Sequence, residues 1–306
     1  MLIVVRQKSG LGNQLFQYAA GRYYAKQCAA DLRIAVEPAR SAHSHGVFSR
    51  PFLLSHFSIS APFGALSRLD RAMLSGQGWL RTARNLLRRA SDVEVFSESV
   101  SQRYRFLSSL PLRPGTKTLY LVGYWQTYRL IEAVEEELRS DLAFSTPPER
   151  ETLAMQHQIK MTPQSVSLHL RRGDYTLAAE GNIALPLSYY MRAISMMESR
   201  LKCPTFFIFS DDMAYAKRHL PTGLRAVFVE HNNDFSSHDD LRLMACCENH
   251  IIANSTFSWW GAWLNDRRDK IVVAPRHWLR TEESYFPDLL PPDWLLLDTL
   301  REASEP

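Results

Sequence analysis

The chain has 306 residues, 45% of them hydrophobic and 22% charged, with a net charge of +4, which excludes disordered, fibrous and collagen-like classes. The sequence has no run of 18 apolar residues, so we expect no helix that spans a bilayer. The N-terminal stretch MLIVVRQKSG is too short for a secretory signal. The four cysteines lack metal-ligand spacing, so we expect a reducing cytoplasmic setting and no structural zinc.

Short apolar runs alternate with helical patterns along much of the chain. The runs predict strands at 2–5, 33–36, 119–122, 165–170, 205–209, 226–229, 251–253 and 271–274. Helical spacing predicts helices at 13–29, 128–142, 186–201, 213–220, 238–248 and 258–266. Strands that are apolar throughout indicate a parallel sheet covered on both faces, and the alternation indicates the α/β class.

The middle of the chain lacks this rhythm. Residues 38–115 are rich in Pro, Ser, Gly and Arg, and we expect an irregular insertion there. Within it, residues 66–90 carry six arginines against the single acid Asp70. This stretch is either a solvated insertion with its apolar side on the core or a peripheral contact with an anionic membrane surface. A Ser-Thr-Pro-Pro linker at 145–148 divides an N-terminal half, 1–147, from a C-terminal half, 148–306.

The first predicted strand is followed by a glycine-containing turn before a helix. The turn comprises Gly10, Gly12, Asn13 and Gln14. Glycines allow close backbone approach to a ligand, and free helix N–H groups attract anions. The alternative is a tight turn in which Asn13 caps the helix. A nicotinamide-binding fingerprint is a weaker interpretation, supported by Glu37 after the second strand but opposed by Leu15 at the place of a third small residue.

The strand predicted at 165–170 runs directly into Arg171, Arg172, Gly173 and Asp174. Ligands of open α/β sheets bind at the carboxyl ends of strands, and a guanidinium matches a diphosphate with two hydrogen bonds. Asp174 is well placed to hold one arginine. The alternative is a purely structural Arg–Asp pair at a strand end.

Polar residues also follow the strand predicted at 205–209. Ser210, Asp211 and Asp212 precede a helix, so Asp212 is either a helix cap or, with its neighbours, a ligand contact. Paired acids also suit Mg²⁺, but a separated D-x-D motif is absent.

A third polar turn lies near the C-terminus. Asn254, Ser255, Thr256 and Ser258 precede a helix and could donate hydrogen bonds to phosphate or ribose oxygens. The tryptophans at 259, 260 and 263 that follow are predicted to be core. Asp240 stands at the start of the preceding helix.

Taken together, four segments resemble bacterial α-1,2-fucosyltransferases of glycosyltransferase family 11. They are GLGNQLFQYA at 10–19, HLRRGDY at 169–175, SDD at 210–212 and NSTFSWWGAWL at 254–264. The resemblance implies a GT-B-like fold of two Rossmann-like halves facing a cleft. It also implies inverting transfer of fucose from GDP-β-L-fucose to the 2-hydroxyl of a galactose, with no metal or other cofactor.

The resemblance assigns roles residue by residue. Arg171 would bind the diphosphate, with Arg172 and Asp174 in support. His169, Ser210, Asp211 and Asp240 would lie on the donor side, Asp240 against guanine. The turn with Asn254, Ser255, Thr256 and Ser258 would hold phosphate and ribose, and Gly10, Gly12, Asn13 and Gln14 would face fucose or acceptor.

The identity of a general base stays open between Asp174, Glu180, His43 and His45, and the alternative to a base is late loss of the proton to phosphate or water. The expected acceptor is a galactose-terminated oligosaccharide or lipid-linked glycan of a bacterial surface polymer such as O-antigen, and no nucleic acid is expected. Alternatives are another GDP-sugar transferase on the same scaffold, a non-catalytic nucleotide- or glycan-binding protein, and a nicotinamide enzyme. The expected location is the cytoplasm, with peripheral contact at the inner membrane through residues 66–90.

Overall fold

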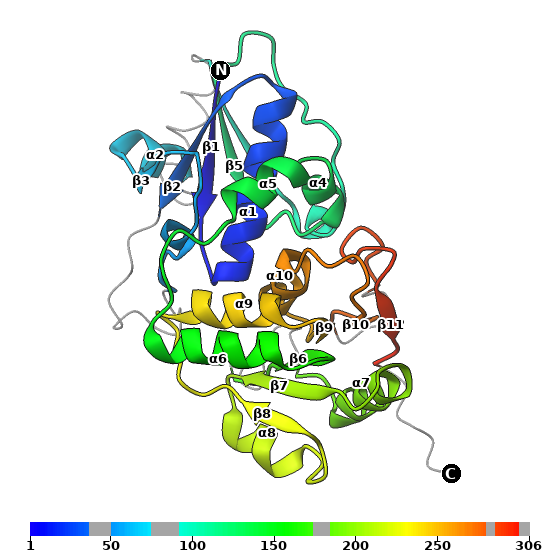
Figure 1. The fold of residues 1–306 in the computed structure, drawn as a ribbon. Coiled ribbons are helices and arrows are strands. Elements are labelled where there is room, and N and C mark those ends of the chain that lie inside the picture. The colour runs from blue at the N-terminus through cyan, green and yellow to red at the C-terminus, as the bar shows by residue number, and fades with distance from the viewer. Residues whose placement is uncertain (37–49, 75–91, 174–183, 280–284, 300–306) are drawn as a thin grey trace. The chain divides into compact units, whose positions relative to one another are not determined.

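A computed structural model describes residues 1–36, 50–74, 92–173, 184–279 and 285–299 (Figure 1). The chain divides into two compact units, 1–146 and 147–306, and each unit is built on its own parallel sheet. The predicted α/β class with parallel sheets is therefore confirmed.

The first unit holds a five-stranded sheet in the order β3-β2-β1-β5-β4, with every neighbouring pair parallel. Its strands are β1 (Leu2–Gln7), β2 (Asp31–Val36), β3 (Phe63–Ala65), β4 (Val93–Ser97) and β5 (Thr118–Val122). Its helices are α1 (Leu11–Gln27), α2 (Arg68–Leu74), α4 (Tyr128–Glu132) and α5 (Glu135–Asp141), with 3-10 turns at Leu54–His56 and Val100–Gln102.

Helix α1 is buried on most of its surface, and Figure 1 shows it running along the sheet. Gly21 permits this packing, because a Cβ there would lie 2.6 Å from Val5 Cγ2 and 2.8 Å from Leu32 Cδ1. The absence of a side chain at Gly21 therefore lets α1 lie close against β1 and β2.

The second unit holds a six-stranded parallel sheet in the order β11-β10-β9-β6-β7-β8. Its strands are β6 (Ser165–Leu170), β7 (Thr205–Ser210), β8 (Ala226–Phe228), β9 (Asn249–Ile251), β10 (Val272–Pro275) and β11 (Leu295–Leu297). Its helices are α6 (Arg150–Met161), α7 (Leu187–Arg200), α8 (Met213–His219), α9 (Ser237–Cys246) and α10 (Thr256–Leu264).

Both faces of this second sheet are covered. On one face Val166, Leu168 and Leu170 pack with residues of α7 and α8. On the other, Phe207 and Phe209 pack with residues of α6 and α9, which lie side by side in Figure 1. Burial on both faces explains why these strands are apolar at nearly every position.

Several predicted elements need correction. The region expected to be irregular contributes β3, β4 and α2 to the first unit. The helix expected at 128–142 is two helices, because Val134 leaves the helical region with φ −134° and ψ 30°. The strand expected at 251–253 lies at Asn249–Ile251, and α6 and β11 were not predicted. Of the basic stretch 66–90, residues 75–90 lie outside the described part of the chain.

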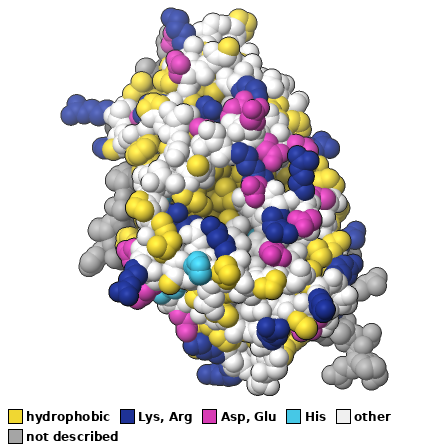
Figure 2. All heavy atoms as spheres, in the orientation of Figure 1, with side chains coloured by type: hydrophobic (Ala, Val, Ile, Leu, Met, Phe, Trp, Pro, Cys, Tyr) yellow, Lys and Arg dark blue, Asp and Glu magenta, His cyan; other side chains and the backbone are white. Residues whose placement is uncertain are grey.

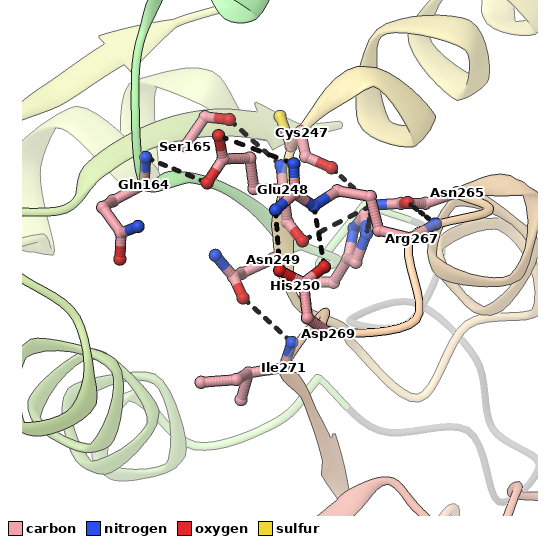
Figure 3. A network of polar contacts seen from close by, with 10 residues as sticks. All are labelled: Gln164, Ser165, Cys247, Glu248, Asn249, His250, Asn265, Arg267, Asp269 and Ile271. Carbon is pink, nitrogen blue, oxygen red and sulfur yellow. Dashed lines mark hydrogen bonds and ion pairs between the residues drawn. The ribbon is translucent and has the colours of Figure 1, made fainter.

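A network of polar contacts closes the amino edge of the second sheet (Figure 3). The buried His250 ring accepts a hydrogen bond at Nε2 from Asn265 Nδ2 (2.9 Å), and its Nδ1 lies 2.8 Å from Ser167 Oγ. Glu248 and Asn249 accept hydrogen bonds from the backbone N–H groups of Gln164 and Ile271. These polar groups at the amino edge form hydrogen bonds with one another and with the backbone, so they stabilise the fold.

On the face drawn in Figure 2, basic and acidic side chains are interspersed. Among the helices of the described residues, none combines the length and apolar character that a membrane crossing requires.

Candidate functional site

Three predicted polar segments meet at the carboxyl edge of the second sheet. They follow β6, β7 and β9, which are neighbours in the order β9-β6-β7. The chain runs outward from β6 through β7 to β8 and from β9 through β10 to β11, so the direction of winding reverses between β6 and β9. Open α/β sheets bind ligands at such a switch point.

Arg171 is held in place by Asp211. Its Nη1 lies 3.0 Å from Asp211 Oδ2, while Asp211 Oδ1 accepts the backbone N–H of Arg172 at 2.8 Å. Gly173 passes so close that a Cβ there would lie 2.6 Å from Asp211 Oδ2. Asp211 thus orients the Arg171 guanidinium at the strand end, where the arginine side chain is 20% exposed. The sequence analysis expected Asp174 in this role, and Asp174 lies outside the described residues.

Arg172 points to the opposite face of the strand. Its guanidinium carbon lies 3.6 Å from the ring centroid of Tyr215 in α8, and its Nε lies 3.6 Å from Asp212 Oδ2. Asp212 also caps α8 by accepting the N–H of Tyr215 (3.0 Å). The capping alternative therefore holds for Asp212, and Arg172 is a neighbour of the site held by stacking and an ion pair.

His169 lies on the same face of β6 as Arg171, since side chains alternate along a strand. It is 5% exposed, its ring packs against Phe257, and no hydrogen-bond partner reaches its Nδ1 among the described residues. Burial, with the Arg171 charge adding to it and Asp211 opposing it, lowers the pKa of His169 to about 3. The ring is therefore neutral at pH 7, with a buried polar atom available to a ligand.

Two predicted contact residues use their hydroxyls inside the fold. Ser210 Oγ donates to Leu170 O (2.8 Å) and accepts from Asp212 N–H (3.0 Å), which ties the ends of β6 and β7 together. Ser258 Oγ accepts from Ala253 N–H (3.2 Å) and donates to Ser255 O (3.3 Å). With these hydrogen bonds, both serine hydroxyls stabilise the conformation of the turns in which they lie.

The remaining residues of the last turn frame the start of α10. Ser255 caps the helix through the N–H of Phe257 (3.4 Å), and Asn254 Nδ2 donates to Trp278 O (3.0 Å). Thr256 is the first residue of α10, so its backbone N–H lies at the N-terminus of the helix. The tryptophans of α10 are buried, as predicted.

Asp240 lies in the first turn of α9, three and four residues before Leu243 and Met244, which pack toward the sheet. Residues with this spacing share one side of a helix, so Asp240 lies on the same side. Its Oδ1 accepts a hydrogen bond from Asn232 Nδ2 at 2.7 Å. Burial raises the pKa of Asp240 to about 7, although Asn232 opposes the shift. The carboxylate thus lies on the side of α9 that faces the sheet and titrates near neutrality.

In the first unit, the turn after β1 is fixed by its own residues. Gly10, not Asn13, occupies the N-cap position, and a Cβ on Gly10 would meet nothing within 4 Å. Asn13 instead donates to Ser9 Oγ (3.0 Å) and accepts from Gln126 Nε2 (2.7 Å). Gln14 is 2% exposed and binds three backbone groups, which makes it structural. Gly12 is buried in the first turn of α1.

Sequence reasoning missed Tyr215, Gln126 and Glu98, whose carboxylate accepts the backbone N–H groups of Tyr124 and Trp125. Gln126 could have been found, because it follows a predicted strand at 119–122. Glu98 could not, because β4 lies in the region expected to be irregular. The other base candidates, His43, His45 and Glu180, lie outside the described residues. Within the described ranges, no three His, Cys, Asp or Glu side chains are grouped as a metal would require.

Comparison with known proteins agrees with this geometry. The chain is 28% identical to an α-1,2-colitosyltransferase of Escherichia coli over 97% of the chain and 99% of that protein. It is 43% identical to the O-antigen biosynthesis glycosyltransferase WbnK of Escherichia coli over 37% of the chain and 39% of that protein.

Solved structures share the fold at low sequence identity. A NodZ α-1,6-fucosyltransferase crystallised with GDP has a TM-score of 0.51 at 13% identity, covering 86% of this chain and 92% of that one. A mutant of Arabidopsis thaliana FUT1 in complex with GDP has a TM-score of 0.51 at 14% identity, covering 95% of this chain and 74% of that one. The two parallel-sheet units of the present chain therefore have a GT-B-like architecture.

The family model for glycosyl transferase family 11 matches residues 86–297, which include the carboxyl edge of the second sheet. The chain is a glycosyltransferase that belongs to family 11.

Proposed function

We propose that this protein transfers L-fucose from GDP-β-L-fucose to the 2-hydroxyl of a galactose in a bacterial surface glycan, with inversion at the anomeric carbon. The observation that carries the proposal is the Arg171 guanidinium, held by Asp211 at the switch-point edge of the second sheet. A planar guanidinium fits the oxygens of a diphosphate.

The expected chemistry uses side-chain and backbone groups of the protein alone. Breaking the C1–O bond of the donor leaves negative charge on the β-phosphate, and groups aimed at this charge stabilise the transition state more than the ground state. Arg171 and the backbone N–H groups at the start of α10 are such groups. His169, held neutral by burial, offers its Nδ1 to the nucleotide side. Asp240 accepts hydrogen bonds from guanine when ionised.

A second candidate donor is GDP-colitose, favoured by the similarity to a colitosyltransferase over 97% of the chain. Colitose differs from fucose by the loss of the 3-hydroxyl. A site that hydrogen-bonds this hydroxyl would reject the deoxy sugar by a factor of about 10⁴. A site that leaves the hydroxyl in solvent would accept both donors.

The test supplies the purified protein with GDP-fucose or GDP-colitose and a panel of β-galactosides that differ in the second sugar. We expect GDP release with fucose, a product linked α-1,2 to galactose, and retained activity in EDTA. A preference for GDP-colitose would establish the second candidate. Binding of GDP without turnover on any acceptor would establish a binding protein, and activity lost in EDTA and restored by Mg²⁺ or Mn²⁺ would contradict the metal-free mechanism.

A further inference from the structure

In the first unit β1 and β5 are parallel neighbours in the order β3-β2-β1-β5-β4, so the loops that follow them leave the sheet at the same edge. These two loops are Lys8–Gly10 after β1 and Gly123–Thr127 after β5. The polar side chains that connect them are amides, in contrast to the paired arginines of the second unit. Amide and backbone groups suit the hydroxyls of an uncharged sugar.

Glu98, directly after β4, holds the second of these loops. Its Oε2 accepts the N–H of Tyr124 at 2.6 Å, and its Oε1 accepts the N–H of Trp125 at 2.9 Å. Trp125 has φ 55°, a left-handed conformation that costs an ordinary residue about 1 kcal/mol or more. Gly123 is required beside it, because a Cβ there would lie 2.5 Å from Glu98 Cβ.

The held loop is bonded to the turn after β1. Gln126 Nε2 donates to Asn13 Oδ1 at 2.7 Å. Gln17 links the loops a second time, because its Nε2 donates to Gly123 O (3.1 Å) and its Oε1 accepts the N–H of Lys8 (3.0 Å). The position of the turn after β1 therefore depends on the loop that Glu98 holds.

The groups around Glu98 come from four segments. Lys8 and Arg103 both approach the Tyr124 ring, at 4.3 and 4.7 Å from its centroid. Tyr104 and Tyr24 lie within electrostatic range of the carboxylate. Burial raises the pKa of Glu98 to about 7, while the two N–H bonds and the two cations oppose the shift.

We propose that Glu98 is a positioning residue: its carboxylate holds the 123–127 loop and, through Gln126 and Asn13, the 10–14 turn in the arrangement that binds an uncharged sugar acceptor. The inference rests on the proposed transfer reaction for the identity of the ligand. Only the carboxylate accepts both N–H groups fully, so protonation near neutral pH weakens the hold. Use of the acceptor therefore falls as the pH falls from 8 to 6.

The kinetic test measures the acceptor KM and the donor KM from pH 6 to 8 with a neutral galactoside. In the wild type we expect the acceptor KM to rise about tenfold toward pH 6, as the ionised fraction of Glu98 falls. Glu98→Gln should have an acceptor KM raised about tenfold and constant with pH, with the donor KM within about twofold of wild type. Glu98→Asp retains a titrating charge and should retain the pH dependence.

A second readout needs no turnover. Hydrogen exchange of the 123–127 segment, corrected for the intrinsic effect of pH, should show about tenfold lower protection in Glu98→Gln. The control is Glu94→Gln, which removes a buried charge on β4 that pairs with Arg113, and it should leave this segment protected.

The outcomes separate the two proposals. Wild-type protection of 123–127 in Glu98→Gln, or an unchanged acceptor KM with its pH dependence intact, would overturn the role of Glu98. Reduced protection of 123–127 in Glu98→Gln, in a protein that transfers no sugar, would refute the proposed function but would support the role of Glu98 in holding the loop.

Discussion

The two edges of the second unit's sheet each hold a buried histidine, and the pKa of each is lowered to about 3, chiefly by burial. His250, at the amino edge, has a hydrogen-bond partner at both ring nitrogens. His169, at the carboxyl edge, has no partner at Nδ1 among the described residues and lies beside Arg171. A similar pKa shift thus accompanies a structural role at one edge and an available ligand contact at the other.

The strongest challenge to this contrast is Arg171→Ala. We expect kcat/KM to fall by a factor of about 10²–10³, because a donor aimed at developing charge is lost. Arg171→Lys should restore little, since lysine lacks the planar fork. Thermal unfolding should be nearly unchanged. A loss smaller than about tenfold, or about 1.4 kcal/mol, would contradict the diphosphate assignment.

At the amino edge the same kind of substitution should act on stability. His250→Ala removes the ring partner of Ser167 Oγ and one of the acceptors of Asn265 Nδ2, and it should lower the free energy of unfolding by about 2–4 kcal/mol, measured by urea denaturation. Kinetic constants should stay within about twofold of wild type. A large fall in kcat at unchanged stability would remove the distinction between the edges.

The sign of the pH effect follows from the lowered pKa. Unfolded histidine titrates near its ordinary value of 6.5, so the unfolded state takes up a proton first as the pH falls. The stability that His250 contributes is present above pH 6.5 and is lost between about 6.5 and 3. The variant should lose part of this acid sensitivity, with His169 retaining its own share.

Asp211→Asn should weaken the carboxyl edge without emptying it. The amide oxygen still accepts the N–H of Arg172, but the charge that orients Arg171 is gone. We expect kcat/KM to fall by about tenfold to a hundredfold, the range of a charge-assisted hydrogen bond. Asp212→Asn is the matched control, since it alters the cap of α8 and the pair with Arg172 and should cost less activity. Equal losses in both variants would argue against a special role for Asp211.

The smallest expected effect concerns Asp240. If its ionised carboxylate binds guanine, affinity for a GDP-sugar should rise up to about tenfold between pH 6 and 8, because the pKa is about 7. A GDP-sugar is a suitable ligand because its phosphodiester groups do not titrate in this range. Asp240→Asn should show a flat profile by calorimetry. A parallel rise in both proteins would place guanine elsewhere.

Strand positions were largely readable from the chain. Apolar runs located β1, β2, β5, β6, β7 and β8, because strands buried on both faces have few polar residues. The edge strands β3 and β11 have three residues each, which is too short for an apolar run to identify a strand, and β4 lay among residues without a βαβ rhythm. The break at Val134 depends on packing that no local pattern reports.

The polar segments at strand ends were likewise predictable, because strands of a parallel sheet end at one edge whatever their order. Their partners were not. Asp211 reaches Arg171 only because β7 lies beside β6, and Glu98 reaches the loop after β5 only because β4 lies beside β5.

Local sequence patterns determined which types of residue lie at the strand ends, and these residue types predict that the ligand is anionic. Which carboxylate holds which loop, and which histidine keeps a nitrogen without a partner, depended on strand order and register. These contacts join residues 26–40 positions apart around Glu98 and Arg171 and 83 positions apart for Ser167 and His250. Local preferences do not encode such contacts, because burial of the whole sheet selects the neighbours.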